Sequence, residues 1–388
     1  MTGGTRGRLV LVSDYHLPTL KAEGEQNVRI AESFSRRGWE TVVIHPHAPG
    51  PDSLREHDPA AYYHVREPLV FRHVDADHVL RHPRLPGRVR YTTAGWRMAV
   101  RARQQAPALA YTRDPVTAWW LTRLGVPTVF EAMTMPRGFP LRAVQGMAGR
   151  PALRLIGCIT EHLREHLSAE LRTGREKLVT LPIGVDAATG ATVSRAEARR
   201  ALGLPEEGGI AVYTGGMRED RGIEVLLHAA RHLPDAEFHL LGGRPGETVR
   251  MRALADELGV RNVRLVKHLP PDRARLYQAA ADVLLMPQAP TNPHLTWYTS
   301  PAKLFEYFAV ERPVVAADVP CFRELIRDRE NALLAEGTGE AWAGAVAALL
   351  RDPALAARVV DTARREVPSY TWDRRAERIH QVLQGNER

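Results

Sequence analysis

A glycine- and arginine-rich segment in the second half of the chain, YTGGMREDRG at Tyr213–Gly222, has residue types that bind anions. Gly215 and Gly216 allow the backbone to turn tightly and to approach a ligand closely. Arg218 and Arg221 add fixed positive charge and can form paired hydrogen bonds with a diphosphate. A helix pattern follows at once, so N–H groups at its start point back to the same place. The segment is neither GxGxxG nor a P-loop, which disfavours a dinucleotide fingerprint or a Walker motif, and a turn with solvated arginines is the plain alternative.

A second segment, TSPAKLFEYFAVERPVV at Thr299–Val315, combines a short amphipathic helix pattern with two charges. Ser300 and Pro301 stand where a hydroxyl cap and a first-turn proline belong. Lys303 and Glu306 lie one turn apart on the otherwise apolar pattern. The helix start suits an anion, and the carboxylate suits a sugar hydroxyl, although such a glutamate alone is more often ion-paired. Because both segments follow strand patterns, we predict a nucleotide-sugar site that joins them.

The elements that must position these residues alternate between strand and helix patterns. A seam at Gly184-Val185-Asp186 separates two such series of similar size. Ligands on doubly wound sheets bind beyond the carboxyl ends of the strands. The prediction is an α/β protein with two doubly wound parallel sheets that face each other across a cleft. Strands are expected at residues 8–13, 41–45, 108–111, 128–131, 155–160 and 177–182, and then at 210–213, 238–241, 263–266, 282–286 and 314–317.

The composition is that of a soluble globular protein long enough for two domains, with 388 residues, 44% apolar and 25% charged. The net charge of +8 comes almost wholly from arginine and fits an anionic substrate as well as an acidic membrane surface. Cys158 and Cys321 lie far apart, as expected for free thiols in a reducing cytoplasm. No Cys/His cluster has metal-ligand spacing, no signal peptide is evident, and no apolar run approaches about 18 residues. We therefore expect a cytoplasmic protein without a metal site or a transmembrane segment.

One region of the first half, His78–Arg103, is strongly basic. From Tyr91 onward it has a helix pattern with Trp96 and Val100 on an apolar side. A solvated helix face is the plain interpretation, and an anionic acceptor site or peripheral contact with lipid are the alternatives. Aromatic residues do not interleave with the basic run, which disfavours nucleic acid. The arginines of the region are Arg81, Arg84, Arg88, Arg90, Arg97, Arg101 and Arg103.

The second segment and several others together resemble a known family. The run TSPAKLFEYFAVERPVVAADVP is similar to the donor-site signature of the retaining glycosyltransferases of family 4, which have the GT-B fold. Tyr213–Ala230 resembles the family's glycine-containing loop, Ala281–Pro287 the strand before the donor helix, and Leu181–Asp186 the interdomain link. Tyr370–Val382 resembles the terminal helix that crosses back to the first domain. The likeness covers most of the chain and is strongest from residue 155 onward.

The resemblance implies an acceptor-side domain at residues 1–183, a nucleotide-sugar donor domain at 184–368, and a crossing helix at 369–388. In the donor domain it implies that Glu306 holds the ribose hydroxyls, while Tyr298 stands where the family's other glutamate is expected. Arg221 takes the place of the phosphate-binding lysine, and Arg218 stands near the position of the family's upstream arginine. Arg221 and Glu306 are therefore the residues expected to support catalysis. The stretch Thr299–Pro301 would meet the donor sugar and phosphates. The other donor-side residues expected are Gly215, Gly216, His268 and Lys303.

The first half departs further from the family pattern. The family often has a glycine pair in the first loop, whereas only Gly24 is near that position here. It often has a histidine after the fourth main strand, and Met133 stands near that place. His16, Arg113 and Glu131 are alternatives for a contact with the sugar, and each also has a plain structural interpretation. These five residues are the candidates on the acceptor side.

The function implied is retaining transfer of a hexose-type sugar from a nucleoside-diphosphate sugar to an acceptor, without a cofactor or metal. A UDP-sugar is favoured over a GDP- or ADP-sugar by family frequency alone. The absence of a large apolar anchor favours a soluble small acceptor in a bacterial biosynthetic pathway, and a lipid-linked or polysaccharide acceptor stays open. A sugar-nucleotide epimerase and a non-catalytic sugar-nucleotide-binding protein are the competing interpretations. The sequence leaves the oligomeric state open.

Overall fold

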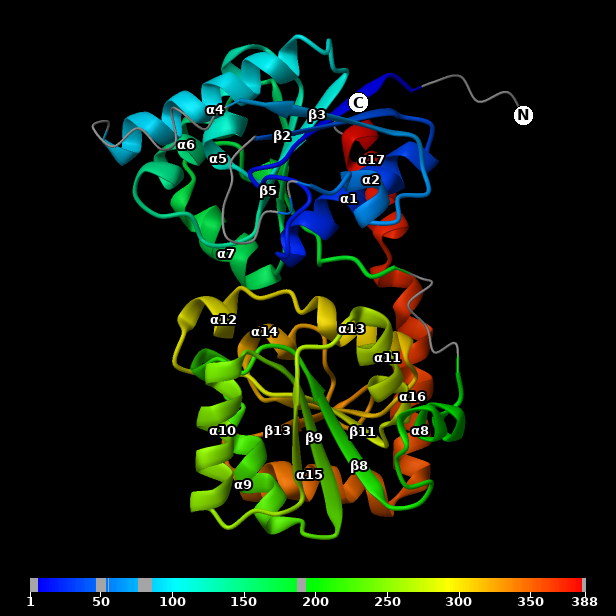
Figure 1. Cartoon of the computed structure of the whole chain (residues 1–388). Coiled ribbons are helices and arrows are strands. Elements are labelled where there is room, and N and C mark those ends of the chain that lie inside the picture. The colour runs from blue at the N-terminus through cyan, green and yellow to red at the C-terminus, as the bar shows by residue number, and fades with distance from the viewer. Residues whose placement is uncertain (1–5, 47–53, 55, 76–85, 187–192, 386–388) are drawn as a thin grey trace. The chain divides into compact units, whose positions relative to one another are not determined.

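The computed structural model describes residues 6–46, 54, 56–75, 86–186 and 193–385. The chain divides into two compact units. The first unit comprises Met1–Gly184 together with Trp372–Arg388, and the second comprises Val185–Thr371. The divisions thus fall at 184/185 and 371/372, close to the sequence-based expectations of 183/184 and 368/369. The terminal segment Trp372–Gly385 is a helix, α17, that belongs to the first unit (Figure 1).

The first unit is built on a seven-stranded parallel sheet in the order β3-β2-β1-β4-β5-β6-β7. Helices α4, α5 and α6 pack side by side, and α1 packs against α17 (Figure 1). The strands are β1 (Arg8–Val12), β2 (Glu40–Pro46), β3 (Leu69–Val74), β4 (Leu109–Thr112), β5 (Thr128–Ala132), β6 (Leu153–Cys158) and β7 (Leu178–Thr180). The helices before α17 are α1 (Ala22–Arg36), α2 (Pro59–Tyr62), α4 (Gly87–Arg103), α5 (Pro115–Arg123), α6 (Phe139–Ala148) and α7 (Glu161–Glu170).

The second unit is built on a six-stranded parallel sheet in the order β10-β9-β8-β11-β12-β13. Its strands are β8 (Gly209–Thr214), β9 (Ala236–Gly243), β10 (Val263–Lys267), β11 (Val283–Met286), β12 (Val314–Ala317) and β13 (Leu333–Ala335). Its helices are α8 (Arg195–Leu202), α9 (Glu224–His232), α10 (Pro245–Glu257), α11 (Pro271–Ala280), α12 (Pro293–Trp297), α13 (Ala302–Ala309), α14 (Pro320–Arg323), α15 (Gly339–Arg351) and α16 (Pro353–Glu366).

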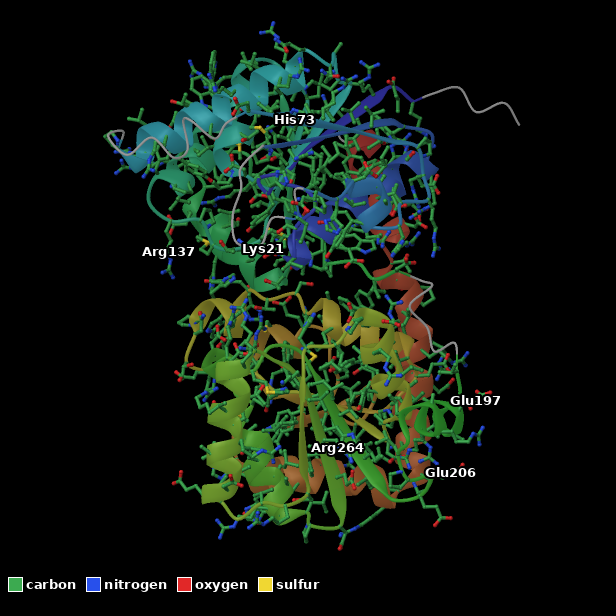
Figure 2. The ribbon with its side chains drawn as sticks, viewed as in Figure 1. Lys21, His73, Arg137, Glu197, Glu206 and Arg264 are labelled. Carbon is green, nitrogen blue, oxygen red and sulfur yellow. The ribbon has the colours of Figure 1, made fainter. Side chains whose placement is uncertain are left out.

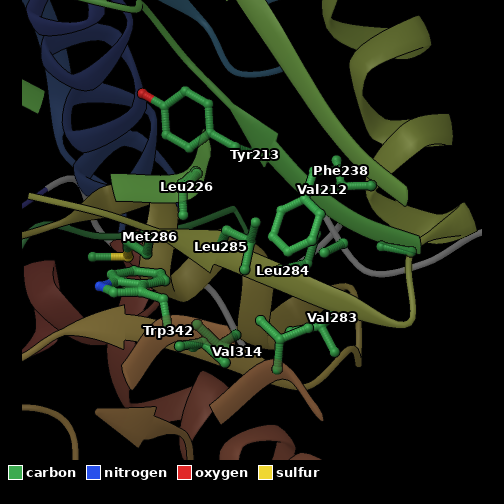
Figure 3. Close-up of a cluster of buried hydrophobic side chains, with 14 of the residues drawn as sticks. Val212, Tyr213, Leu226, Phe238, Val283, Leu284, Leu285, Met286, Val314 and Trp342 are labelled. Atoms are coloured by element: carbon green, nitrogen blue, oxygen red, sulfur yellow. The ribbon is translucent and has the colours of Figure 1, made fainter. Parts of the chain in front are cut away.

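The core of the second unit lies on the apolar strands at the centre of its sheet. Val212, Phe238, Leu284 and Val314 come from four neighbouring strands, and all are fully buried. Trp342 of α15 is buried in the same cluster (Figure 3). Burial of one such side chain contributes roughly 1.5–3 kcal/mol. Continuous apolar strands of this kind are typical of parallel sheets covered on both faces, so the predicted doubly wound α/β architecture is confirmed.

Several element boundaries differ from the sequence-based expectations. Helix α4 begins at Gly87 rather than Tyr91, because Pro86 sets the N-cap and the helix starts directly after it. β6 begins two residues earlier than expected. The short elements α12 and β13, which we did not predict, contain only five and three residues, too few to show a period. The strand before the glycine segment, β8, and helix α13 each begin and end within one residue of the expected positions.

Charged side chains lie mainly at the surface, as Glu197, Glu206 and Arg264 of the second unit show (Figure 2). Within the described ranges, none of the helices combines the length and apolar character required to cross a bilayer. The same residues contain no group of three or more His, Cys, Asp or Glu side chains that could hold a metal ion. Cys158 and Cys321 are both buried free thiols.

Candidate functional site

Helix α13 carries the two charges that the sequence singled out. Leu304, Phe305 and Tyr307 are fully buried, which fixes the helix against the sheet. Lys303 and Glu306 lie on its partly buried side. The helix begins one residue later than expected, with Pro301 at the N-cap and no side-chain cap. Ser300 thus lies one position before the N-cap rather than at it, and its carbonyl accepts from the Ala302 N–H at 3.1 Å.

A buried hydrogen-bond group joins α13 to the end of β8. The Tyr307 hydroxyl oxygen accepts from the Thr214 N–H at 3.0 Å and also lies 3.0 Å from Thr214 Oγ1. Gln278 of α11 donates to Thr214 Oγ1 at 3.1 Å. Thr214 is the residue that leads into the glycine segment, so these bonds hold the two predicted site segments together. The carboxyl ends of β8 and β11 are neighbours in the sheet, as the fold requires.

The ammonium group of Lys303 lies against the glycine segment. Its Nζ is 4.4 Å from the centre of the Tyr213 ring, a cation–π distance. Gly215 has φ +144°, and a Cβ at that position would lie 2.4 Å from Lys303 Nζ. The positive φ favours glycine at this position, and a larger residue would also displace the end of the Lys303 side chain. Burial, aided by the positive charge of Arg221 and opposed by Glu306, lowers the pKa of Lys303 to about 7.

The two arginines of the segment differ in their partners. Arg218 is exposed and forms a two-point ion pair with Asp220, with Nε–Oδ1 3.0 Å and Nη2–Oδ2 2.8 Å. The Arg221 guanidinium makes no ion pair or side-chain hydrogen bond with a described residue. Gly222 has φ +65° and lies close to the chain at Ala289, where a Cβ would be 2.8 Å from the amide nitrogen. Arg221 is therefore the better placed cation for an added anion.

Helix α10 braces the same segment from the other side. Glu247 Oε2 accepts from the Met217 N–H at 3.0 Å and from the Arg244 N–H at 3.0 Å. Arg250 Nη2 donates to the Met217 carbonyl at 2.8 Å, and Arg250 also pairs with Glu224 at the start of α9. The Met217 peptide groups are thus held at both ends. Our sequence analysis missed this brace, because Glu247 is 30 residues beyond Met217 and nothing local marks it.

The remaining donor-side candidates lie at or near the carboxyl edge of the second sheet. Thr299 is partly buried and Ser300 is buried, directly before α13. Gly216 is exposed and has open space around its Cα. His268 is exposed just after β10. Tyr298 ends α12, with its N–H donated to the His294 carbonyl. The structure therefore gathers Gly215, Arg221, Lys303 and the start of α13 at one edge, where they could hold a diphosphate.

Known proteins are similar to this chain over the region that contains both segments. The model of the family described as glycosyl transferases group 1 matches residues 208–352, which include the glycine segment and α13. The D-inositol 3-phosphate glycosyltransferase of Xylanimonas cellulosilytica is 32% identical over 288 residues, which cover 67% of each protein. The chain belongs to the group 1 glycosyltransferases. The corresponding protein of Acidothermus cellulolyticus is 30% identical over 283 residues, 66% of this chain and 61% of the relative's own length.

Solved structures identify the fold of this glycosyltransferase. The Anabaena protein HepE, solved in complex with UDP, has a TM-score of 0.76 at 16% identity and covers 97% of this chain and 100% of its own. Sucrose-phosphate synthase of Thermosynechococcus elongatus has a TM-score of 0.73 at 18% identity, over 97% and 98% of the two chains. At these identities the likeness establishes the GT-B fold alone.

In the first unit of the glycosyltransferase, Glu131 and Arg113 belong to a buried ionic network. The Glu131 carboxylate is fully buried and pairs with Arg113 at 2.8 Å, with Arg375 of α17, and with the Tyr111 hydroxyl. Arg113 also donates to Gln26 of α1 at 3.0 Å. The two cations hold the pKa of Glu131 below its ordinary value despite the opposing effect of burial. This network fastens α17 to the sheet, and it gives Glu131 a structural function.

The other acceptor-side candidates lie apart from this network. His16 is buried, with Nδ1 3.2 Å from the Pro46 carbonyl and its ring against His45. Met133 is partly buried just after β5. Gly24 lies in the first turn of α1, where a Cβ would be 2.5 Å from the Tyr63 hydroxyl oxygen. Packing against Tyr63 therefore accounts for the glycine without a phosphate ligand.

Proposed function

We propose that this glycosyltransferase moves a hexose-type sugar from a nucleoside-diphosphate sugar, with UDP as the favoured nucleotide, and that the anomeric configuration is retained. The observation that carries the proposal is the junction of Lys303 with the Gly215 segment at the carboxyl edge of the second sheet. Arg221 lies in the same segment without a partner among the described residues. The structural neighbour HepE was solved with UDP-glucose, which supports the choice of nucleotide.

The donor would bind with its diphosphate between Arg221, Lys303 and the N–H groups at the start of α13. Donors of hydrogen bonds that face developing charge are usually the largest catalytic contribution. Glu306, one turn into α13, is assigned to the ribose hydroxyls. Arg218 is a weaker candidate for binding the diphosphate, because it already forms an ion pair with Asp220.

Transfer would proceed on one face of the sugar. The bond from the anomeric carbon to the diphosphate oxygen breaks, and the leaving diphosphate gathers negative charge next to Arg221. The acceptor hydroxyl forms its new bond on the same face and gives its proton to a diphosphate oxygen. No side chain then becomes covalently bound, and the chain supplies binding and electrostatic stabilisation alone.

A soluble, hydroxyl-bearing small molecule is the proposed acceptor. The curated relatives are named for an inositol phosphate acceptor, so polyols and sugar phosphates form the first panel to test. The enzyme would be incubated with UDP-, GDP-, ADP- and TDP-sugars, with and without each acceptor, and products would be examined by NMR. The expected product has the donor's anomeric configuration and requires an acceptor. A new sugar nucleotide formed from donor alone would indicate an epimerase, and tight donor binding without any product would indicate a binding protein.

A further inference from the structure

The three helices α4, α5 and α6 of the first unit form a layer without a single carboxylate side chain. They contain 17, 9 and 10 residues. Asp and Glu make up 45 of the 388 residues of the chain, about one in nine, so about four would be expected here. The layer instead carries seven arginines. These are Arg88, Arg90, Arg97, Arg101 and Arg103 in α4, Arg123 in α5 and Arg142 in α6.

A general preference for arginine does not explain this segregation, because other helices of the same unit are balanced. In α1, Arg29 pairs with Glu32 at 2.8 Å, and Arg36 pairs with Asp373 of α17 at 2.9 Å. In the α4–α6 layer most of the arginines lack such partners. No ion pair with a described residue is formed by Arg88, Arg101, Arg103, Arg123 or Arg142. Asp114, the cap of α5, is buried and holds Thr117 and the Tyr91 hydroxyl.

Apolar side chains stand among these charges on the outer side of α4. Val89 and Trp96 are 45% and 44% exposed, and Tyr91 of the same helix is 37% exposed. Val89 and Trp96 are seven residues apart, as are Trp96 and Arg103, so these three lie along one stripe of the helix. The opposite side is anchored, because Met98 and Ala102 pack into the core. The stripe is therefore a fixed outer surface of a firmly packed helix.

Neighbouring helices extend the same surface. The guanidinium carbon of Arg88 lies 4.9 Å from the Phe139 ring centre of α6, and that of Arg123 lies 5.1 Å from the Trp119 ring centre of α5. Arg137, in the loop before α6, also projects into solvent (Figure 2). The three helices lie side by side in Figure 1. Two arginine–ring contacts thus lie within the layer, and its three helices contain no carboxylate.

We propose that the α4–α6 face binds the surface of an anionic lipid bilayer, with α4 lying along the headgroups. Arginines near such a surface each contribute about one kcal/mol, a factor of about five in partition. Tryptophan prefers the interface between water and hydrocarbon, which suits the exposed Trp96. Val89 favours lipid over nucleic acid, because an aliphatic side chain neither stacks on bases nor forms hydrogen bonds with them. This surface is independent of the donor site, so it goes beyond the proposed reaction.

The test is co-sedimentation of the full chain with vesicles. At about 50 mM salt we expect binding to phosphatidylcholine vesicles that contain 30% phosphatidylglycerol, and none to phosphatidylcholine alone. About 0.5 M salt should release the protein, because screening weakens exposed charges. The triple variant Arg103→Gln, Arg123→Gln, Arg142→Gln should bind on the order of 100-fold more weakly. The matched control, Arg252→Gln, Arg273→Gln, Arg358→Gln, removes the same charge from exposed sites of the second unit and should bind like the wild type.

A second measurement keeps the proposal falsifiable independently of those variants. Vesicles with brominated acyl chains should quench part of the tryptophan emission, and Trp96→Phe should abolish most of that quenching. Equal binding to neutral and anionic vesicles, no binding at low salt, or equal loss in both triple variants would overturn the proposal. Displacement from vesicles by stoichiometric duplex DNA would assign the face to nucleic acid instead. Binding of the donor nucleotide, measured without vesicles, should be the same in all these variants as in the wild type.

Discussion

The Tyr307 hydroxyl lies 3.0 Å from the amide nitrogen of Thr214, and the pair joins helix α13 to the strand that precedes the glycine segment. Both residues are buried. Tyr307→Phe would leave the Thr214 N–H without a partner, which costs about 1–3 kcal/mol. We expect a lower free energy of unfolding in urea by that amount and weaker donor binding. Tyr277→Phe is the control, because its hydroxyl makes no hydrogen bond with a described residue. Equal effects in the two variants would contradict the relationship.

The brace on Met217 predicts a positioning effect by Glu247. Glu247→Ala removes the oxygen that accepts from the Met217 and Arg244 N–H groups. Loss of these bonds should raise the donor KM about tenfold and leave kcat largely unchanged, because no reacting group is removed. Glu247→Gln keeps an acceptor oxygen and should restore most of the affinity. Glu257→Ala, at the exposed end of the same helix, is the matched control. A fall in kcat without a change in KM would argue against positioning.

The lowered pKa of Lys303 predicts proton uptake when the donor nucleotide binds. With a pKa of about 7, Lys303 is mostly neutral at pH 8, and a nearby diphosphate would favour its charged form. Nucleotide binding should therefore take up a proton at pH 8 and hardly any at pH 6, where the group is already charged. Calorimetry in buffers of different ionisation enthalpy measures this uptake. Lys303→Met should abolish it, and Lys21→Met in the first unit should not.

The lowered pKa of Lys303 also predicts how stability changes with pH. The unfolded chain holds the Lys303 proton up to about pH 10.5, whereas the folded chain releases it near pH 7. Between these values the unfolded state binds more protons, so the contribution of Lys303 to stability rises with pH. The difference in unfolding free energy between the wild type and Lys303→Met should accordingly rise from pH 7 to pH 10. A difference that stays constant across this window would contradict the burial of Lys303.

The buried network around Glu131 predicts a loss of stability. Glu131→Ala would leave Arg113 and Arg375 buried without their carboxylate, which costs about 3–5 kcal/mol. Glu377→Ala on α17 breaks an exposed pair with Arg374 and a longer one, at 4.0 Å, with Arg37, and should cost no more than about 1 kcal/mol. Urea unfolding followed by circular dichroism measures both. If Glu131→Ala leaves stability unchanged but abolishes transfer, Glu131 has a direct role in sugar contact.

Much of the structure at the carboxyl edge of the second sheet could be predicted from local sequence, because its determinants are local. Gly215 and Gly222 indicate turns with positive φ, and the spacing of apolar residues in α13 indicates a helix. Both are short-range patterns that can be recognised in the sequence. The strand order then places β8 beside β11, which brings the glycine segment and α13 to the same edge of the sheet. The architecture of two parallel sheets was likewise expected from alternation alone.

What the sequence could not provide were contacts between distant residues. Arg375 is 244 residues beyond Glu131, so the residues around Glu131 in the sequence do not reveal that its carboxylate pairs with a buried arginine. The ion pair between Arg218 and Asp220 is local, yet its formation depends on the turn that the loop adopts. The packing of Gly24 against Tyr63 similarly depends on α2. These are tertiary relationships, and they decide which charged residues are available to a ligand.

Nucleotide binding by site variants tests the central claim most directly. Calorimetric titration of UDP would be compared among the wild type, Arg221→Ala, Glu306→Ala and the control Arg218→Ala, whose charge Asp220 already meets. We predict that Arg221→Ala and Glu306→Ala each raise the Kd at least about tenfold, the loss of a charge-assisted hydrogen bond, and that Arg218→Ala changes it far less. Wild-type affinity in both Arg221→Ala and Glu306→Ala would contradict the donor site proposed for this glycosyltransferase.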